Sequence, residues 1–133
     1  MKLLTRNTDY GIRALLFIVK EKGRVVAVPE LVQALKIPRP FLRKILQRLV
    51  KKGFIKSYKG VGGGFRSALP ANKIYIVEVV KAFQGPISLN ECFLKKELCP
   101  NRKVCPLKRK IDRIERHIVS ELETITIAEL LKG

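Results

Sequence analysis

Three cysteines lie close together in the second half of the chain, and they are the side chains best suited to metal or redox chemistry. Six residues separate Cys92 from Cys99 and five separate Cys99 from Cys105, so no Cys-x-x-Cys pair exists. This spacing fits neither a zinc ribbon nor a thioredoxin-type dithiol. Three thiolates within fourteen residues can nevertheless wrap one metal centre, and neighbouring lysines and arginines favour the thiolate form. Spacing alone does not identify the metal, and three unrelated cysteines are the alternative.

The second chemical feature is an excess of positive charge. Lys and Arg number 28 against 11 Asp and Glu, which gives a net charge of +17. Residues 31–77 contain no acidic side chain at all. A solvated surface normally mixes both signs, so this run predicts a face that meets phosphates, with a role in solubility as the alternative. The candidate DNA contacts are Arg39, Arg43, Lys44, Arg48, Lys51, Lys59 and Arg66.

Apolar residues at helical spacing predict three helices that would position the first of these side chains. Asn7 or Thr8 is the expected cap of the first helix, which closes by Gly23. The second helix begins near Pro29, and after a tight connection the third covers about residues 39–52. The side chains expected to point inward from the third helix are Phe41, Leu42, Ile45, Leu46 and Leu49. Two short helices joined by a tight turn, the second of them basic, are typical of a helix-turn-helix.

A hairpin is expected directly after the third helix. Residues 54–58 and 65–69 have strand patterns, and the glycine-rich residues 59–64 form the turn between them. A hairpin in this place is the wing of a winged helix. The glycine cluster lacks the Gly-Lys-Ser/Thr ending of a nucleotide-binding loop, so we do not assign it that role.

A fourth helix begins near Ile76 and stops at Gly85, and a longer helix begins at Pro106. The long helix carries an apolar stripe close to a heptad pattern, formed by Leu107, Ile111, Ile114, Ile118, Leu122 and Ile125. We interpret it as a dimerisation helix, with burial inside its own subunit as the alternative. Thr126 and Glu129 form a capping box for a last short helix. The chain therefore divides into a DNA-binding domain (1–85), a cysteine loop (86–105) and a dimerisation segment with its tail (106–133).

Length and composition bound the class of protein. The chain has 133 residues, about one domain, and 47% of them are hydrophobic. No apolar stretch approaches the roughly 20 residues that span a bilayer, and no secretory signal pattern is present. An odd number of cysteines and no sign of export favour a reducing compartment. We therefore expect a cytoplasmic protein without membrane contact.

The region from Ile37 to Phe65 resembles the IscR/NsrR (Rrf-two) family of bacterial transcription regulators. The likeness rests on the Phe41-Leu42 and Ile45-Leu46 pairs, the segment 52–57, the Gly-x-Gly-Gly-Gly-aromatic wing and the cysteine triplet, and it continues over nearly the whole chain. The resemblance implies a mainly α fold with a small β wing, in a homodimer that binds a double-stranded DNA operator. It also implies that the cysteines hold an iron–sulfur cluster, as in many members, and that the state of the cluster sets DNA affinity.

The fourth cluster ligand is where this sequence departs from part of the family. IscR-like members place a histidine three residues after the last cysteine, and here that residue is Lys108, a poor iron ligand. NsrR-like members use an aspartate early in the first helix, supplied by the partner subunit, and Asp9 matches that position. An acid there is also favoured by the helix dipole alone. His117, the only histidine, is expected to pack on the long helix.

Together these features predict a homodimeric DNA-binding regulator, a repressor, with Cys92, Cys99, Cys105 and Asp9 as ligands of an iron–sulfur cluster. A 4Fe-4S cluster is favoured over a 2Fe-2S cluster, and the signal (redox, nitric oxide, or iron and cluster supply) stays open. The alternative is a cluster-free or zinc-bearing winged-helix regulator that senses thiol oxidation. An enzyme or electron carrier is disfavoured by the lone histidine and the lack of a catalytic carboxylate pair, and no small-molecule substrate is expected.

Overall fold

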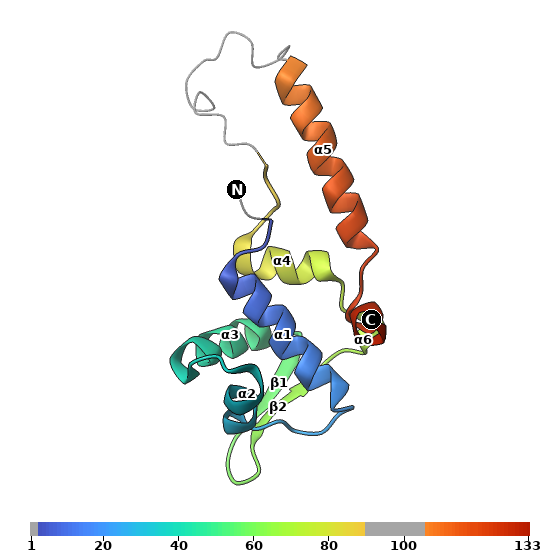
Figure 1. Cartoon of the computed structure of the whole chain (residues 1–133). Helices are drawn as coiled ribbons and strands as arrows, with labels where there is room; N and C mark the ends of the chain where they lie inside the picture. Colours follow the sequence, from blue (N-terminus) through green and yellow to red (C-terminus); the bar gives the residue numbers. More distant parts are fainter. Residues whose placement is uncertain (1–2, 90–105) are drawn as a thin grey trace.

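The computed structural model describes residues 3–89 and 106–133 of the chain. Its elements in chain order are α1 (Arg6–Lys20), α2 (Val28–Leu35), α3 (Arg39–Lys51), β1 (Ile55–Tyr58), β2 (Gly64–Ser67), the short 3-10 helix η1 (Ala71–Lys73), α4 (Ile76–Gln84), α5 (Pro106–Glu123) and α6 (Ile127–Lys132). The first four helices and the hairpin lie together in one body, and α5 extends away from it (Figure 1). The predicted class, mainly helical with a two-stranded wing and a long C-terminal helix, is confirmed.

Helix α1 begins at Arg6, because Thr5 is its N-cap. The Thr5 hydroxyl accepts a hydrogen bond from the Thr8 amide at 3.2 Å. Thr8 itself is fully buried, and its hydroxyl donates to Gln84 Oε1 at 2.7 Å. The expected cap, Asn7 or Thr8, was therefore wrong: Thr8 lies inside the helix and its hydroxyl is used in a tertiary contact with α4.

One face of α1 forms the centre of the core. Ala14, Leu15 and Ile18 have no exposed surface, and burial of a side chain as large as Leu15 or Ile18 contributes about 1.5–3 kcal/mol to folding. The same cluster contains fully buried residues of α3 and α4, namely Leu42, Leu46, Leu49, Val79 and Val80. Helix α3 is therefore held by its apolar stripe, and the rest of its surface is left to the solvent.

The wing is a two-stranded antiparallel hairpin, with Ile55 opposite Ser67 and Tyr58 opposite Gly64. A third pairing comes from the loop between α1 and α2. The Val26 amide donates to the Phe65 carbonyl at 2.7 Å, and the Phe65 amide donates back to the Val26 carbonyl at 2.8 Å. The wing is thus bonded to the α1–α2 loop, a connection that no local pattern in the sequence indicates.

Gly64 is the point of closest approach between the wing and this loop. A Cβ at Gly64 would lie 2.7 Å from the Val26 carbonyl carbon and nearer still to its oxygen. Backbone atoms cannot move aside as a flexible side chain can, and the φ of +157° is itself unusual for other residues. Only glycine fits between these two backbones.

The C-terminal segment returns to the body after α5. The Ile76 amide donates to the Ile125 carbonyl and the Ile127 amide donates to the Ile74 carbonyl, both at 2.9 Å. Ile127 is fully buried, and α6 lies against α1 and η1. The expected cap of this helix is confirmed, since the Thr126 hydroxyl accepts from the Glu129 amide.

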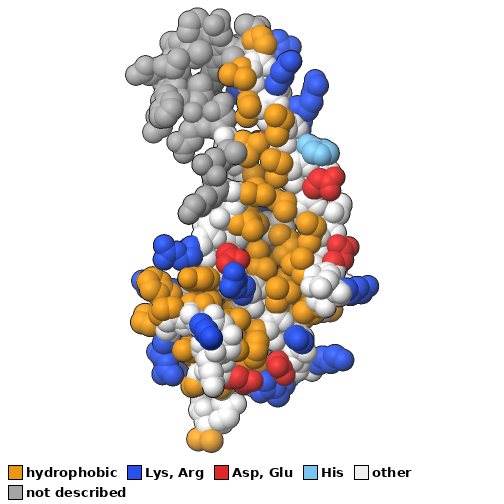
Figure 2. All heavy atoms as spheres, viewed as in Figure 1, with side chains coloured by type: hydrophobic (Ala, Val, Ile, Leu, Met, Phe, Trp, Pro, Cys, Tyr) orange, Lys and Arg blue, Asp and Glu red, His pale blue; other side chains and the backbone are white. Residues whose placement is uncertain are grey.

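Helix α5 covers Pro106–Glu123 and has no buried residue. Leu107 and Ile114 of the predicted stripe are 65% and 50% exposed. Ile125, the last expected member of the stripe, lies beyond the end of the helix and is used in the contact with Ile76. Figure 2 shows hydrophobic side chains in a band that runs along α5 toward the body. Leu122 and Ile125 pack against the core, and Ile111 and Ile118 are partly buried, so within the described part of this subunit the stripe is most open at Leu107 and Ile114.

Replacing Gly64 with alanine should lower the free energy of unfolding by about 3 kcal/mol, because overpacking and an unfavourable φ act together. Gly60→Ala is the matched control, since Gly60 also has a positive φ but nothing lies within 4 Å of its Cβ position. Its cost should be limited to backbone strain of about 1 kcal/mol. Chemical denaturation measures both, and equal losses would show that the contact with Val26 does not matter.

Candidate nucleic-acid interface

Helix α3 separates an apolar face from a basic one. Leu42, Ile45, Leu46 and Leu49 are buried, as the sequence predicted. The five basic residues predicted to contact DNA from this helix are all exposed, namely Arg39, Arg43, Lys44, Arg48 and Lys51. The helix contains no acidic residue to neutralise them. This surface has the charge and the helical shape that the major groove of DNA accepts.

Phe41 is not an inward-pointing residue, and that prediction was wrong. Its side chain is 50% exposed in the first turn of α3. Leu42, Ile45, Leu46 and Leu49 already form the apolar stripe of α3 that faces the core. Phe41 lies about 100° around the helix from Leu42 and so falls outside this stripe. An aromatic side chain is therefore exposed in the first turn of α3, at the end of the helix that enters the groove in helix-turn-helix proteins.

The wing presents two further basic residues. Lys59 is exposed at the start of the turn, and Arg66 is exposed on β2 opposite Lys56. The Arg66 guanidinium lies 5.3 Å from the centre of the Tyr58 ring, a cation–π contact that limits where the cation can point. Val61 at the turn is fully exposed. The wing therefore carries positive charge on both sides of an apolar residue.

A groove of about 560 Å³ lies between α3 and the wing. Gln47 and Lys51 line it from α3, and Tyr58 and Lys59 line it from the wing. The start of α2 forms another side through Val28. The groove brings together the predicted contacts Lys51 and Lys59, which are separated in the sequence by the whole of β1.

The predicted cluster ligands are not brought together within the described structure. Cys92, Cys99 and Cys105 lie outside the described residues. Asp9 is in the first turn of α1, 45% exposed, and its carboxylate forms an ion pair with Arg13 Nε at 3.1 Å. A partly exposed carboxylate of this kind is free to exchange one cation for another.

Lys108 is poorly suited to be a fourth ligand. Its Nζ donates to Asp112 Oδ2 at 2.8 Å in an ion pair along α5. An ammonium has no lone pair to offer iron. His117 is exposed on α5 in the described part of this subunit, and its imidazole is also a donor that iron accepts. Asp9 and His117 are therefore the two described candidates with a suitable donor atom.

Hydrogen bonds of Gln84 and Leu89 hold the described residues that precede the cysteines. Gln84, the last residue of α4, accepts from the Thr5 amide and from the Thr8 hydroxyl, and its side-chain amide donates to the Leu3 carbonyl. The Leu89 amide donates to Glu115 Oε1 on α5 at 2.9 Å. The start of α1, which carries Asp9, is therefore fastened to the end of α4.

None of the described helices has the length and hydropathy needed to cross a membrane.

Comparisons with known proteins agree with this architecture. The family model described as Rrf2, iron-dependent transcriptional regulator, matches residues 4–133. The structure of CymR, the global cysteine regulator of B. subtilis, superposes with a TM-score of 0.83 at 21% identity, over 99% of this chain and 98% of that one. T. potens IscR gives a TM-score of 0.75 at 20% identity, over 99% and 87%. Staphylococcus aureus CymR gives 0.75 at 17% identity, over 97% and 98%.

The solved structures establish the winged-helix fold, and the family model covers almost the entire chain. The resemblance found in the cysteine triplet and the glycine-rich wing is thereby confirmed at the level of the family. Membership also settles the class of activity, because these proteins regulate transcription at DNA operators. The chain belongs to the Rrf2 family of iron-dependent transcriptional regulators, DNA-binding proteins and not enzymes.

Proposed function

We propose that this chain is a homodimeric repressor whose DNA affinity depends on an iron–sulfur cluster held by Cys92, Cys99, Cys105 and Asp9. The observation that carries the DNA-binding part is the exposed basic face of α3 with the wing beside it. Residues 1–85 then form the DNA-binding unit, residues 86–105 the cluster loop and residues 106–133 the dimerisation segment. The protein would act in the cytoplasm, on double-stranded DNA.

The basic side chains divide between reading bases and holding phosphates. Arg39, Arg43 and Lys44 occupy the first half of α3, the part of a recognition helix that meets base edges. Arg43 suits guanine, whose O6 and N7 accept a bidentate pair of hydrogen bonds. Lys51 and Lys59 flank the groove between α3 and the wing, where a phosphate backbone would pass. The remaining contacts in the proposal are Arg48 and Arg66.

The proposal of a homodimer rests on α5. Its apolar stripe is only partly covered by the described part of the subunit, and Leu107 and Ile114 are at least half exposed. A second copy of the same helix offers a matching stripe, and burial of both would remove this surface from water. Two recognition helices in a dimer read two half-sites about one helical turn apart.

The proposal of a cluster rests on the chemistry of the donors. Three thiolates and one carboxylate make a ligand set that iron accepts, and Asp9 is exposed enough to exchange Arg13 for iron. By the resemblance, Asp9 would serve the cysteines of the partner subunit. When bound, the cluster supplies iron that reacts with oxygen or nitric oxide. A carboxylate binds iron more weakly than a thiolate does, so Asp9 is the ligand most easily lost.

The described contacts indicate how Asp9 is connected to the recognition helix. Asp9 is on α1, and α1 contacts both α3 and α4. Thr8, its neighbour, is bonded to Gln84 at the end of α4. A change in the partner of Asp9 therefore acts on a helix that supports α3 directly.

A cluster-free or zinc-bearing sensor of thiol oxidation is the second candidate. It is favoured by one contact: Asp9 already has a partner in Arg13 and needs no metal to be satisfied. Visible absorption of anaerobically purified protein distinguishes the two candidates, because zinc and free thiols are colourless in that range.

DNA binding should weaken steeply with salt, since neutralised phosphates release counterions. Arg43→Ala should relax sequence choice, whereas Lys51→Ala should weaken all sequences about equally and reduce the salt slope by about 1. Fluorescence anisotropy with selected and scrambled duplexes measures both. Lys132→Ala, which removes an exposed charge from α6, is the control. A salt-insensitive affinity would contradict the assignment of phosphate contacts.

Replacing Ile114 or Ile118 with glutamate should give monomers and weaken operator binding, because a charge in the stripe opposes its burial. Ser120→Glu adds the same charge on the exposed opposite side of α5 and should leave the dimer intact. Light scattering gives the mass in solution. An unchanged dimer in the isoleucine variants would mean that the stripe is covered within its own subunit.

Replacing any one of the three cysteines with alanine should abolish the cluster, whereas Asp9→Ala should leave a cluster that no longer controls DNA binding. The measurements are visible absorption with iron and sulfide counts on anaerobic protein, followed by DNA binding with and without oxidant. Asp112→Ala removes a carboxylate on α5 and should change neither. Normal cluster stability and normal control of DNA binding in Asp9→Ala would assign the fourth position to another ligand.

A further inference from the structure

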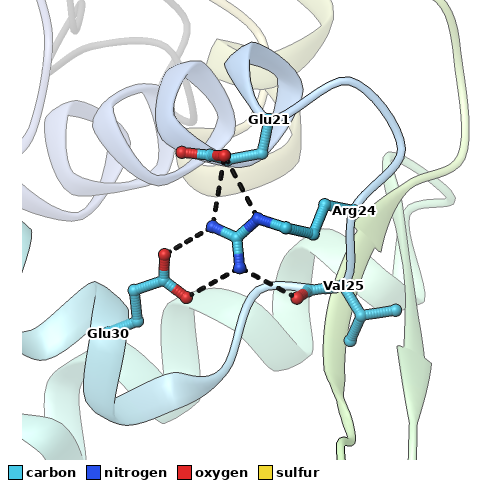
Figure 3. A network of polar contacts seen from close by, with 4 residues as sticks. All are labelled: Glu21, Arg24, Val25 and Glu30. Atoms are coloured by element: carbon cyan, nitrogen blue, oxygen red, sulfur yellow. Dashed lines mark hydrogen bonds and ion pairs between the residues drawn. The ribbon is translucent and has the colours of Figure 1, made fainter.

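Arg24 lies in the loop between α1 and α2 and joins the two helices. Figure 3 shows its guanidinium between Glu21 and Glu30. Arg24 Nε and one terminal nitrogen each lie 3.2 Å from Glu21 Oε2, at the C-cap of α1. The two terminal nitrogens also bond to the two carboxylate oxygens of Glu30, in the first turn of α2. A planar guanidinium is the side chain able to hold two carboxylates in this way.

The loop that Arg24 closes is the same loop that supports the wing. Val26, two residues further on, is fully buried and exchanges both backbone hydrogen bonds with Phe65 on β2. Arg24 also donates to the carbonyl of Val25, directly before Val26. The position of Val26 therefore depends on how the loop is held at its two ends, by Glu21 and by Glu30.

We propose that Arg24 is a positioning residue for the wing, acting through the pairing of Val26 with Phe65. It contacts no DNA in this role. By fixing the loop, Arg24 fixes the angle of the wing to α3 and hence the width of the groove between Lys51 and Lys59. The proposal rests on the DNA-binding function proposed above and extends it to a residue outside the basic run.

The charges around Arg24 support this role. Glu30 is the last acidic residue before the acid-free run of residues 31–77, and its neighbours Val28 and Pro29 line the groove beside the wing. Hydrogen bonds from Arg24 hold the pKa of Glu30 below its ordinary value, so this carboxylate stays ionised and paired. Ion pairs as exposed as these contribute little to the free energy of unfolding. Loss of Arg24 should therefore alter the loop without unfolding the protein.

The first test needs no DNA. In Arg24→Gln, amide hydrogen exchange at Val26 and Phe65 should become about three- to tenfold faster, while amides in the core of α3 keep their rates. Lys22→Gln is the matched control, because it removes an exposed cation from the same loop outside the network. A role in global stability alone would accelerate all of these amides together. Unchanged exchange at Val26 and Phe65 would overturn the proposal.

The second test uses a 30-base-pair duplex selected from a random library by the unaltered protein. In Arg24→Gln the hydroxyl-radical protection under the wing should disappear while the protection under α3 remains, and the affinity should fall about three- to tenfold. The Lys22→Gln control should keep the complete footprint. The same footprint loss in both variants, or in neither, would overturn the proposal.

A third variant separates geometry from charge. Adding Glu21→Gln and Glu30→Gln to Arg24→Gln removes the carboxylates that would otherwise repel DNA. Wing protection should stay lost in this triple variant, because the loop is still not held. Full recovery of the protection under the wing would show that Arg24 acts only by neutralising charge. Failure of the unaltered protein to select any duplex would count against the proposed function, and the exchange test would still decide the role of Arg24.

Discussion

The buried face of α1 is the contact on which the rest of the structure depends. α1 contacts α2, α3, α4, α6 and β2, so both parts of the proposed DNA-binding surface and the C-terminal tail are positioned against one helix. Gly11 lets Phe83 of α4 pack closely on α1, because a Cβ at Gly11 would clash with the Phe83 ring. Burial of the Leu15 and Ile18 side chains away from water stabilises the fold, and it also fixes the orientation of the basic face of α3.

The same helix connects the proposed DNA-binding unit to the proposed sensor. Its first turn carries Asp9, and Thr8 next to it is a fully buried polar residue bonded to Gln84. Its last turn leads through Glu21 into the loop that Arg24 closes and that Val26 bonds to the wing. The proposed signal enters at one end of α1 and the wing is supported from the other, so a small displacement of this helix reaches both the recognition helix and the wing.

The charge distribution complements this arrangement. Arginine and lysine side chains dominate the outer face of α3 and the wing, whereas Glu21 and Glu30 are drawn to Arg24 at the edge of that surface. On α5, by contrast, Asp112 pairs with Lys108 along the helix, so charges of both signs flank the apolar stripe. The phosphate-facing and subunit-facing surfaces of the chain thus differ in chemistry, which fits a protein proposed to bind DNA as a dimer.

The sequence alone determined what depends on local periodicity and composition: the helix order, the hairpin after α3, the basic run, the capped last helix and the family likeness of the wing and cysteines. These follow from side-chain spacing and turn chemistry, which act between near neighbours. Tertiary structure decided what depends on partners distant in the chain. Thr5 rather than Thr8 caps α1 because Thr8 bonds to Gln84, and Gly64 is required because Val26, 38 positions earlier in the sequence, lies against it. Phe41 stays exposed because Leu42 and the other buried residues of α3 already fill the space under the helix. The volume available in a core cannot be read from the spacing of apolar residues in the sequence.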